Sequence, residues 1–263
     1  MRLHWLTSAV ALGALAFLYL PMLAVALFSF NRTRHGLGWG GFTWDWYVRL
    51  SQNPALLEAA QNTLVLALLS ILVATVLGTL LALGLERHPF GPRGRALLET
   101  TLYLPVVTPD LILAAALMVA FGFLRQAFSL FEPGLPAMVV GHATFQVGFV
   151  ALVVMSRLKS LPRELDEAAR DLYATYSLYL RRVLLPLLAP GIVAGAMLAF
   201  TLSLDDFVIS FFTAGPTSQT LPLVIYASAR RGITPEIHAV STLLFLFTVV
   251  LVLSAERFTR RSA

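Results

Sequence analysis

The sequence contains no cysteine among its 263 residues, so neither disulfide bonds nor thiol chemistry contributes to its structure or function. It also has few charges: Asp, Glu, Lys and Arg make up 13% of the chain, about half the share found in soluble domains. Hydrophobic residues account for 58%, and the mean hydropathy is +0.79. This composition excludes an ordinary soluble fold and indicates a protein that crosses a membrane several times.

Sequence motifs of nucleotide-binding and hydrolytic enzymes are also missing. The chain has no Gly-x-x-x-x-Gly-Lys-[Ser/Thr] loop to bind ATP phosphates, and neither His-Glu-x-x-His nor Gly-x-Ser-x-Gly occurs. We therefore expect a transport subunit rather than an enzyme, with no catalytic residue, no metal and no cofactor. If ATP drives transport, the ATPase is a separate chain.

Long apolar runs predict an all-α fold in which one transmembrane domain occupies residues 1–263. We place six membrane-spanning helices near residues 5–29, 62–85, 97–123, 137–156, 190–213 and 237–255. Each is close to the length of about 20 residues that a span requires. The first run is too long for a cleaved signal peptide and lacks its small-residue cleavage site, so we expect it to remain as a helix.

The basic residues orient these helices. With the N-terminus inside, 13 of the 19 Lys and Arg residues fall on the inner side and six on the outer side. Basic residues concentrate in cytoplasmic loops, so both termini are expected in the cytoplasm. The net charge of +5 mainly reflects this asymmetry. Membrane lipid, and not nucleic acid, is the expected partner of this chain.

The cytoplasmic loop 157–189 carries an unusual share of the charge. Pro162 suits the first turn of a helix, and acidic residues follow it near the positive end of the helix dipole. Arg170 is spaced to pair with Asp166 or Glu167. An apolar face would hold Leu165, Ala168, Ala169 and Leu172. Small Ala side chains on that face permit close approach, so the loop predicts a helix that docks on another protein; a solvated amphipathic loop is the alternative.

The loop also resembles a known family. Glu167-Ala168-Ala169, followed by Val183-x-Leu185-Pro186 at the family's spacing, resembles the EAA loop of ABC importer permease subunits. The resemblance implies a type I ABC importer permease fold and coupling helices that bind a dimeric cytoplasmic ATPase subunit. The coupling residues would be Glu167, Ala168, Ala169, Tyr173, Leu185 and Pro186. The family usually has Gly at Tyr173, where Gly permits a left-handed turn; with Tyr, either that turn forms or the helix continues.

Other segments resemble the polyamine (spermidine/putrescine) branch of these importers, and its second permease in particular. They are Ala199–Ser210, Gly215-Pro216, Leu221–Tyr226, Pro109-Asp110, Ile233–Glu236 and the N-terminal Tyr19–Pro21 and Ser29–Asn31. The resemblance covers essentially the whole chain. It implies polyamine import across a bacterial inner membrane, with a second, related permease and a periplasmic or lipid-anchored substrate-binding protein as partners. Thiamine and ferric iron remain alternative cargoes.

Three carboxylates, Asp110, Asp205 and Asp206, fall inside expected spans, where ionisable groups are costly and indicate function. A rise of about 1.5 Å per residue places Asp110 and Asp205 both roughly 20 Å from the inner surface. Ser203, one turn before Asp206, is expected on the same face. We predict that these residues form the substrate pathway, because each ammonium group of a polyamine needs an acceptor when it leaves water. Alternatively, Asp110 caps a restarted helix, and the Asp pair bonds to Ser or Thr.

The outer loop 31–61 contains an aromatic run with Trp44, Trp46 and Tyr47. Such rings favour the membrane interface, but a Trp face also attracts organic cations. We select Trp46, beside Asp45, as a substrate-facing ring. His142 and His238 are isolated in sequence and receive no role. A self-sufficient ion-coupled transporter is the second class of function, although it would not require the loop 157–189.

Overall fold

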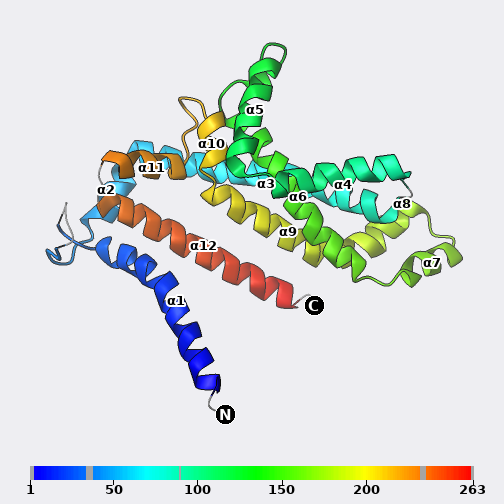
Figure 1. The fold of residues 1–263 in the computed structure, drawn as a ribbon, viewed down its shortest axis with the longest axis horizontal. Coiled ribbons are helices and arrows are strands. Elements are labelled where there is room, and N and C mark those ends of the chain that lie inside the picture. The colour runs from blue at the N-terminus through cyan, green and yellow to red at the C-terminus, as the bar shows by residue number, and fades with distance from the viewer. Residues whose placement is uncertain (1–2, 34–37, 89, 232–234, 262–263) are drawn as a thin grey trace. The chain divides into compact units, whose positions relative to one another are not determined.

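The computed structural model describes residues 3–33, 38–88, 90–231 and 235–261, which are mostly helical (Figure 1). The described chain divides into two compact units. One comprises Met1–Glu58 with Val224–Leu251, and the other comprises Ala59–Leu223 with Val252–Ala263.

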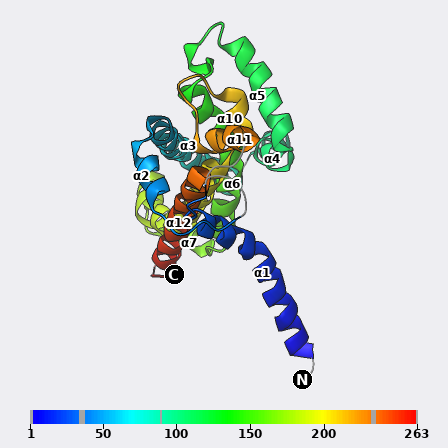
Figure 2. The same cartoon turned by 90° about the vertical axis from the view of Figure 1, so that its left-hand side faces the viewer.

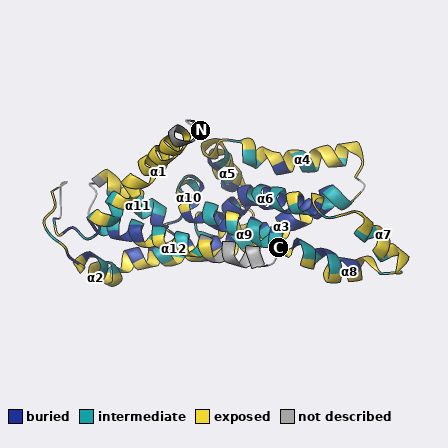
Figure 3. Cartoon of the chain, turned by 90° about the horizontal axis from the view of Figure 1, so that it is seen from below, coloured by how far each residue is buried: buried dark blue, intermediate teal, exposed yellow. Residues whose placement is uncertain are grey.

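The first unit contains the N-terminal helix and an aromatic loop. Its helices are α1 (Leu3–Phe28), α2 (Asp45–Gln52), the greater part of α11 (Leu221–Arg231) and most of α12 (Pro235–Arg261). The apolar stretch of α1 is exposed along its length (Figure 3), and the ring of Phe17 is 81% exposed. An apolar helix with this exposure requires lipid or another protein around it.

The second unit is organised around α6 (Leu135–Lys159), the most buried of its long helices. The other elements are α3 (Pro54–Arg87), α4 (Pro92–Val107), α5 (Asp110–Leu124), a 3-10 turn (Ser129–Phe131), α7 (Glu164–Asp171), α8 (Tyr176–Tyr179), a π turn (Leu180–Leu184), α9 (Leu185–Asp205) and α10 (Val208–Thr213). Helix α6 packs against α4, α9 and α10. Helix α5 packs against α10, and these two helices can be followed in Figure 2.

Glycines allow α6 to approach its neighbours closely. A Cβ atom added at Gly148 would lie 2.7 Å from the carbonyl oxygen of Leu102 on α4, and one at Gly191 on α9 would lie 2.6 Å from Cβ of Arg157. Neither distance leaves room for a side chain. Small residues at helix crossings are typical of membrane proteins, in which van der Waals packing drives helix association.

The structure confirms an all-α membrane protein, while the count of six spans remains a prediction. Four helices in the described ranges are long and apolar enough to cross a membrane: Thr7–Phe28, Pro54–Arg87, Leu135–Lys159 and Tyr176–Asp205. The bent pair α4 and α5 makes a fifth crossing if it counts as one span, and Pro235–Leu251 is a shorter apolar helix.

Two expected spans are interrupted, which corrects the prediction of continuous helices at 97–123 and 190–213. Helix α4 ends at Val107 and α5 begins at Asp110 after a bend of 116°. Thr108 is extended there, with ψ 131°, because the ring of Pro109 disfavours a helical residue before it. The depth estimated for Asp110 assumed a straight helix and therefore does not apply. Helix α9 begins earlier than expected, at Leu185, and ends at Asp205.

Candidate functional site

The break after α9 is built around Asp206. This residue is extended, with φ −63° and ψ 122°, and the chain resumes helical geometry in α10. Its two carboxylate oxygens accept hydrogen bonds from the backbone N–H groups of Ile209, at 3.3 Å, and Ser210, at 2.8 Å. The side chain is only 9% exposed. Asp206 therefore caps the first turn of α10 from inside the unit.

His142 on α6 completes the contacts of Asp206. Its Nε2 atom lies 3.2 Å from a carboxylate oxygen of Asp206 and 3.0 Å from Oγ of Ser210. Its Nδ1 atom lies 2.8 Å from Oγ of Ser203, which is 3.4 Å from Oγ of Ser70 on α3. The imidazole is fully buried. One ring thus connects α6 to both sides of the break between α9 and α10.

The sequence alone indicates no role for His142 and predicts Ser203 on the same face as Asp206. In the structure Ser203 bonds to the imidazole. The sequence does contain a signal for this contact. A buried polar side chain requires a hydrogen-bond partner, and the Ser and Asp residues of the expected span 190–213 are candidates for that of His142. Sequence spacing does not relate residues on different helices, so this pairing was missed.

Asp205 and Asp110 differ from Asp206 because both are exposed. Asp110 occupies the first turn of α5, and Asp205 is the last residue of α9. Asp110 and Asp206 are both near enough to Asp205 for their carboxylates to interact with it electrostatically. The three carboxylates therefore lie in one region: two of them are accessible, and the third is engaged in structure.

This region favours a positive ligand. The C-terminal end of a helix carries a partial negative charge, and Asp205 adds a full carboxylate at the end of α9. In other membrane transporters, cations bind at interrupted helices that present carbonyls and carboxylates. Among the described residues, no group of three or more His, Cys, Asp or Glu side chains could hold a metal ion.

Trp46 has a different environment from the one expected for a substrate-facing ring. It is 5% exposed, and its indole N–H donates to the carbonyl oxygen of Asn31 at 2.8 Å. The guanidinium of Arg49 lies 5.1 Å from the ring centroid. These contacts favour a structural role in holding the loop after α1 together. The neighbouring rings of Phe30, Phe42, Trp44 and Tyr47 pack on one another.

Helix α7 lies in the segment 157–189, for which the sequence predicts docking on another protein, and it ends in a left-handed turn at Tyr173. This residue has φ 54°, an unusual value for a residue other than Gly. The N–H of Tyr173 donates to the carbonyl of Arg170, and that of Ala174 donates to the carbonyl of Ala169. This is the Schellman pattern that ends many helices. The turn therefore forms despite Tyr, and the alternative of a continuing helix is wrong.

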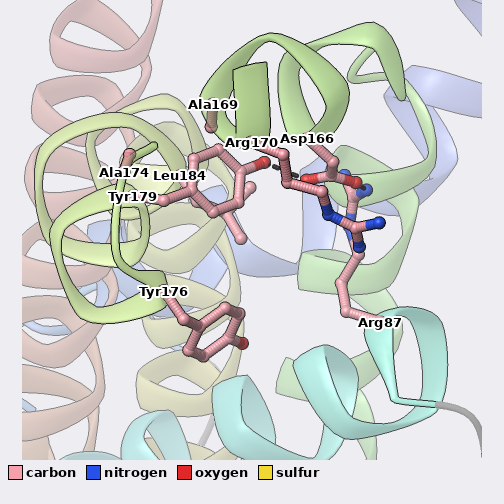
Figure 4. Close-up of a pocket in the computed structure, with 8 residues that line it drawn as sticks. All are labelled: Arg87, Asp166, Ala169, Arg170, Ala174, Tyr176, Tyr179 and Leu184. Atoms are coloured by element: carbon pink, nitrogen blue, oxygen red, sulfur yellow. Dashed lines mark hydrogen bonds and ion pairs between the residues drawn. The ribbon is translucent and has the colours of Figure 1, made fainter. Parts of the chain in front are cut away.

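The faces of α7 differ from the expected arrangement. Asp166 pairs with Arg87 at the end of α3 and accepts a hydrogen bond from the hydroxyl of Tyr179, so the expected pair with Arg170 is replaced (Figure 4). Ala169 packs toward the apolar cluster of Tyr179 and Leu184. Glu167 and Ala168 are exposed. Ala168 and Ala169 therefore do not share one docking face: Ala168 lies on the exposed side of α7, and Ala169 contacts the rest of the chain.

Leu185 and Pro186 lie where the segment enters α9. The N–H of Leu185 donates to the carbonyl of Leu180, which closes a π turn, and Pro186 follows without an N–H of its own. A π turn at such a position accommodates the hydrogen bond that proline removes. The helix continues through Pro190.

Comparison with known proteins agrees with this architecture. Residues 74–263 match the family described as "Binding-protein-dependent transport system inner membrane component". The chain belongs to this family. Its members are transport components, and the family description places them in the inner membrane.

Individual relatives are similar over most of their length. The spermidine/putrescine transport system permease protein PotC of Escherichia coli (strain K12) is 38% identical over 93% of this chain and 90% of its own. Its counterpart in Haemophilus influenzae is 35% identical over 100% of this chain and 99% of its own. The putrescine transport system permease protein PotI of Escherichia coli (strain K12) is 37% identical over 93% and 86%.

Solved structures share the fold. A chain of a bacterial ABC transporter involved in the import of the acidic polysaccharide alginate aligns with a TM-score of 0.76 at 23% identity, covering 99% of this chain and 96% of that one. A chain of the MetNI methionine ABC transporter aligns with a TM-score of 0.63 at 20% identity, covering 84% and 100%. The type I ABC importer permease fold is therefore shown.

Proposed function

We propose that this chain is a permease subunit of an ATP-driven importer that carries polyamines, such as spermidine or putrescine, across a bacterial inner membrane. Both termini face the cytoplasm, and six spans form the domain. The family and the relatives described above support this function. The observation that carries the cargo assignment is a pair of exposed carboxylates at interrupted helices: Asp205 ends α9, and Asp110 begins α5, which packs against α10 just beyond the break.

The partners follow from this function. A cytoplasmic ATPase dimer binds the coupling segment, a second related permease completes the membrane pathway, and a periplasmic or lipid-anchored protein delivers the cargo. Glu167, Ala168 and Tyr173 form the exposed face of that segment, and Ala169 packs toward the apolar cluster of Tyr179 and Leu184. Leu185 and the exposed Pro186 begin α9, where the segment leads into that helix. The chain itself hydrolyses no ATP.

The substrate pathway contains Asp205 and Asp110, with Asp206 and Ser203 holding the break in shape. Each ammonium group of a polyamine loses water on entering the pathway, and a carboxylate compensates for that loss. Thiamine and ferric iron are the competing cargoes, because both are cationic. An anionic cargo would meet the two exposed carboxylates of Asp205 and Asp110.

The test is uptake of radiolabelled spermidine by proteoliposomes that contain the complete transporter. We expect Asp205→Asn and Asp110→Asn each to reduce uptake per assembled complex by about tenfold, since one lost ionic contact amounts to roughly 1–2 kcal/mol. Glu99→Gln is the matched control, because it removes a carboxylate whose exposed pair with Arg95 contributes little. Unchanged uptake in both Asp variants would contradict the pathway.

A competition experiment separates the cargoes. Unlabelled spermidine, putrescine, thiamine or ferric iron is added in excess to the wild-type transporter during the same assay. Competition by polyamines alone supports the assignment. Competition by thiamine or ferric iron with no effect of putrescine would overturn the polyamine cargo but leave the importer function in place.

A further inference from the structure

We propose that Arg87, Asp166 and Tyr179 form a clamp that holds the coupling helix α7 to the end of α3 and transmits movement of α7 to that helix. The inference rests on the proposed function, because a coupling helix implies an ATPase that moves it. The three residues are positioning residues: they touch neither cargo nor nucleotide.

The clamp joins three elements through one carboxylate. Asp166 of α7 uses one oxygen for the ion pair with Arg87, the last residue of α3, and the other for the hydroxyl of Tyr179, the last residue of α8 (Figure 4). The side chains of Arg87 and Asp166 are 13% and 24% exposed. This partial burial reduces screening by water and salt, so the pair is stronger than an ion pair in free solution.

Within the part of the chain that the structure describes, few other contacts fix the position of α7. The helix has eight residues, which is too short for independent stability in water. Ala169 provides an apolar contact one turn after Asp166, against the cluster of Tyr179 and Leu184. Without the clamp, the orientation of α7 relative to α3 would depend on this small contact, on the half-buried Leu165 and on the loops at its two ends.

A second ion pair at the same end of α3 provides an internal control. Lys159, the last residue of α6, lies 3.2 Å from a carboxylate oxygen of Glu86, the residue before Arg87. The Lys159 side chain is 60% exposed. This pair ties α6 to α3 and does not include α7. Breaking it changes the charge at the same place but leaves the clamp intact.

The route of transmission is specific. Helix α3 is one of the long apolar helices, and Ser70 on it lies 3.4 Å from Ser203, which contacts His142 beside the break after α9. A displacement of α7 that reaches α3 therefore has a packed, hydrogen-bonded connection to the region of Asp205. Coupling of this kind requires rigid contacts between elements, and the clamp supplies the first of them.

The experiment compares ATP hydrolysis with uptake in the same proteoliposomes. The complete transporter is prepared with Arg87→Gln, Asp166→Asn, Tyr179→Phe or the control Lys159→Gln. We expect the ATPase to remain bound in all four. Spermidine uptake per ATP hydrolysed should fall about fivefold or more in Arg87→Gln and Asp166→Asn, in the range of typical couplings between sites, and less in Tyr179→Phe. Lys159→Gln should retain the wild-type ratio.

A charge exchange tests the contact itself. The double variant Arg87→Asp with Asp166→Arg restores an ion pair with the two charges exchanged. We expect it to recover most of the spermidine uptake per ATP hydrolysed that the single variants lose. The double variant also decides the outcome if the single variants lose the ATPase, because recovery of binding supports the clamp and continued loss contradicts it. A purely structural role would lower the amount of complex and leave the ratio unchanged.

The outcomes separate the two proposals. Wild-type ratios in both Arg87→Gln and Asp166→Asn would overturn the clamp while leaving the importer function intact. If the wild-type complex hydrolyses ATP but takes up no spermidine, the cargo is wrong, and the clamp is then judged from the stimulation of hydrolysis by the binding protein. A wild-type chain that binds no ATPase would overturn the proposed function and the clamp with it.

Discussion

The imidazole of His142 and the carboxylate of Asp206 lie 3.2 Å apart in the interior of the second unit, where His142 is fully buried. Asp206 uses the same carboxylate to cap α10. The pair therefore holds the point at which α9 stops and α10 begins. The exposed Asp205 is adjacent in sequence, so its direction depends on this buried pair.

Removal of His142 should destabilise the protein strongly. In His142→Ala, Asp206 and Ser203 lose a buried hydrogen-bond partner, and leaving a buried polar group without its partner costs about 1–3 kcal/mol. We expect a lower midpoint of thermal unfolding for the detergent-purified complex. The double variant with Asp206→Asn should lose less free energy of unfolding than the two single variants lose together. The difference should be about 0.5–3 kcal/mol, because the two residues contact each other. Additive losses would show that the pair has no energetic coupling.

Tyr173 should accept Gly but not Val. A left-handed Tyr costs roughly 1–2 kcal/mol, and Gly removes that cost but adds about 0.5–1 kcal/mol of backbone entropy, so Tyr173→Gly should be near neutral. A β-branched residue is strained at φ 54°. Hydrogen exchange of the Ala174 amide, which bonds to Ala169, measures the turn. We expect slow exchange in Gly and faster exchange in Val; equal rates would contradict the strain argument.

The spans illustrate what the sequence can predict. Apolar runs identified the long helices because a membrane-spanning helix needs only length and hydropathy. The break at Pro109 also had a local signal, since the residue before proline avoids helical geometry. This signal is compatible with Asp110 capping a restarted helix, which was one of two interpretations of that residue. The break after Asp205 has neither Pro nor Gly beside it, and it depends on His142 from another helix.

The segment 157–189 shows the same limit. Helical spacing predicted a partner for Asp166 within its own helix, at Arg170. The structure instead pairs Asp166 with Arg87, which is distant in sequence. Spacing rules describe neighbours on one helix, and they contain no information on the packing of α7 against α3. The turn at Tyr173 was an open alternative because Tyr tolerates a positive φ only when the surrounding contacts fix it.

Gly148 should not accept even a methyl group. A Cβ atom there would lie 2.7 Å from the Leu102 carbonyl, which is backbone and cannot move aside easily. We expect Gly148→Ala to cost about 1–3 kcal/mol, as overpacking usually does, and to reduce the yield of folded protein in the membrane. Gly122→Ala is the control: it lies in α5 with no atom within 4 Å of the added Cβ. Equal yields of the two variants would contradict close packing of α4 on α6.

Trp46 provides the final test, because its two interpretations predict different measurements. The indole N–H bonds to Asn31, and the ring is buried. Trp46→Phe retains a ring but leaves the Asn31 carbonyl without this donor, which costs about 1–3 kcal/mol. We therefore expect both Trp46→Phe and Trp46→Ala to lower the unfolding midpoint, with Ala lower, while spermidine uptake per assembled complex stays unchanged. The exposed ring of Trp44 serves as the control through Trp44→Phe, which should alter the midpoint little. If uptake per complex falls in Trp46→Ala at an unchanged midpoint, Trp46 faces the substrate, and the buried position seen here is not the one that acts in transport.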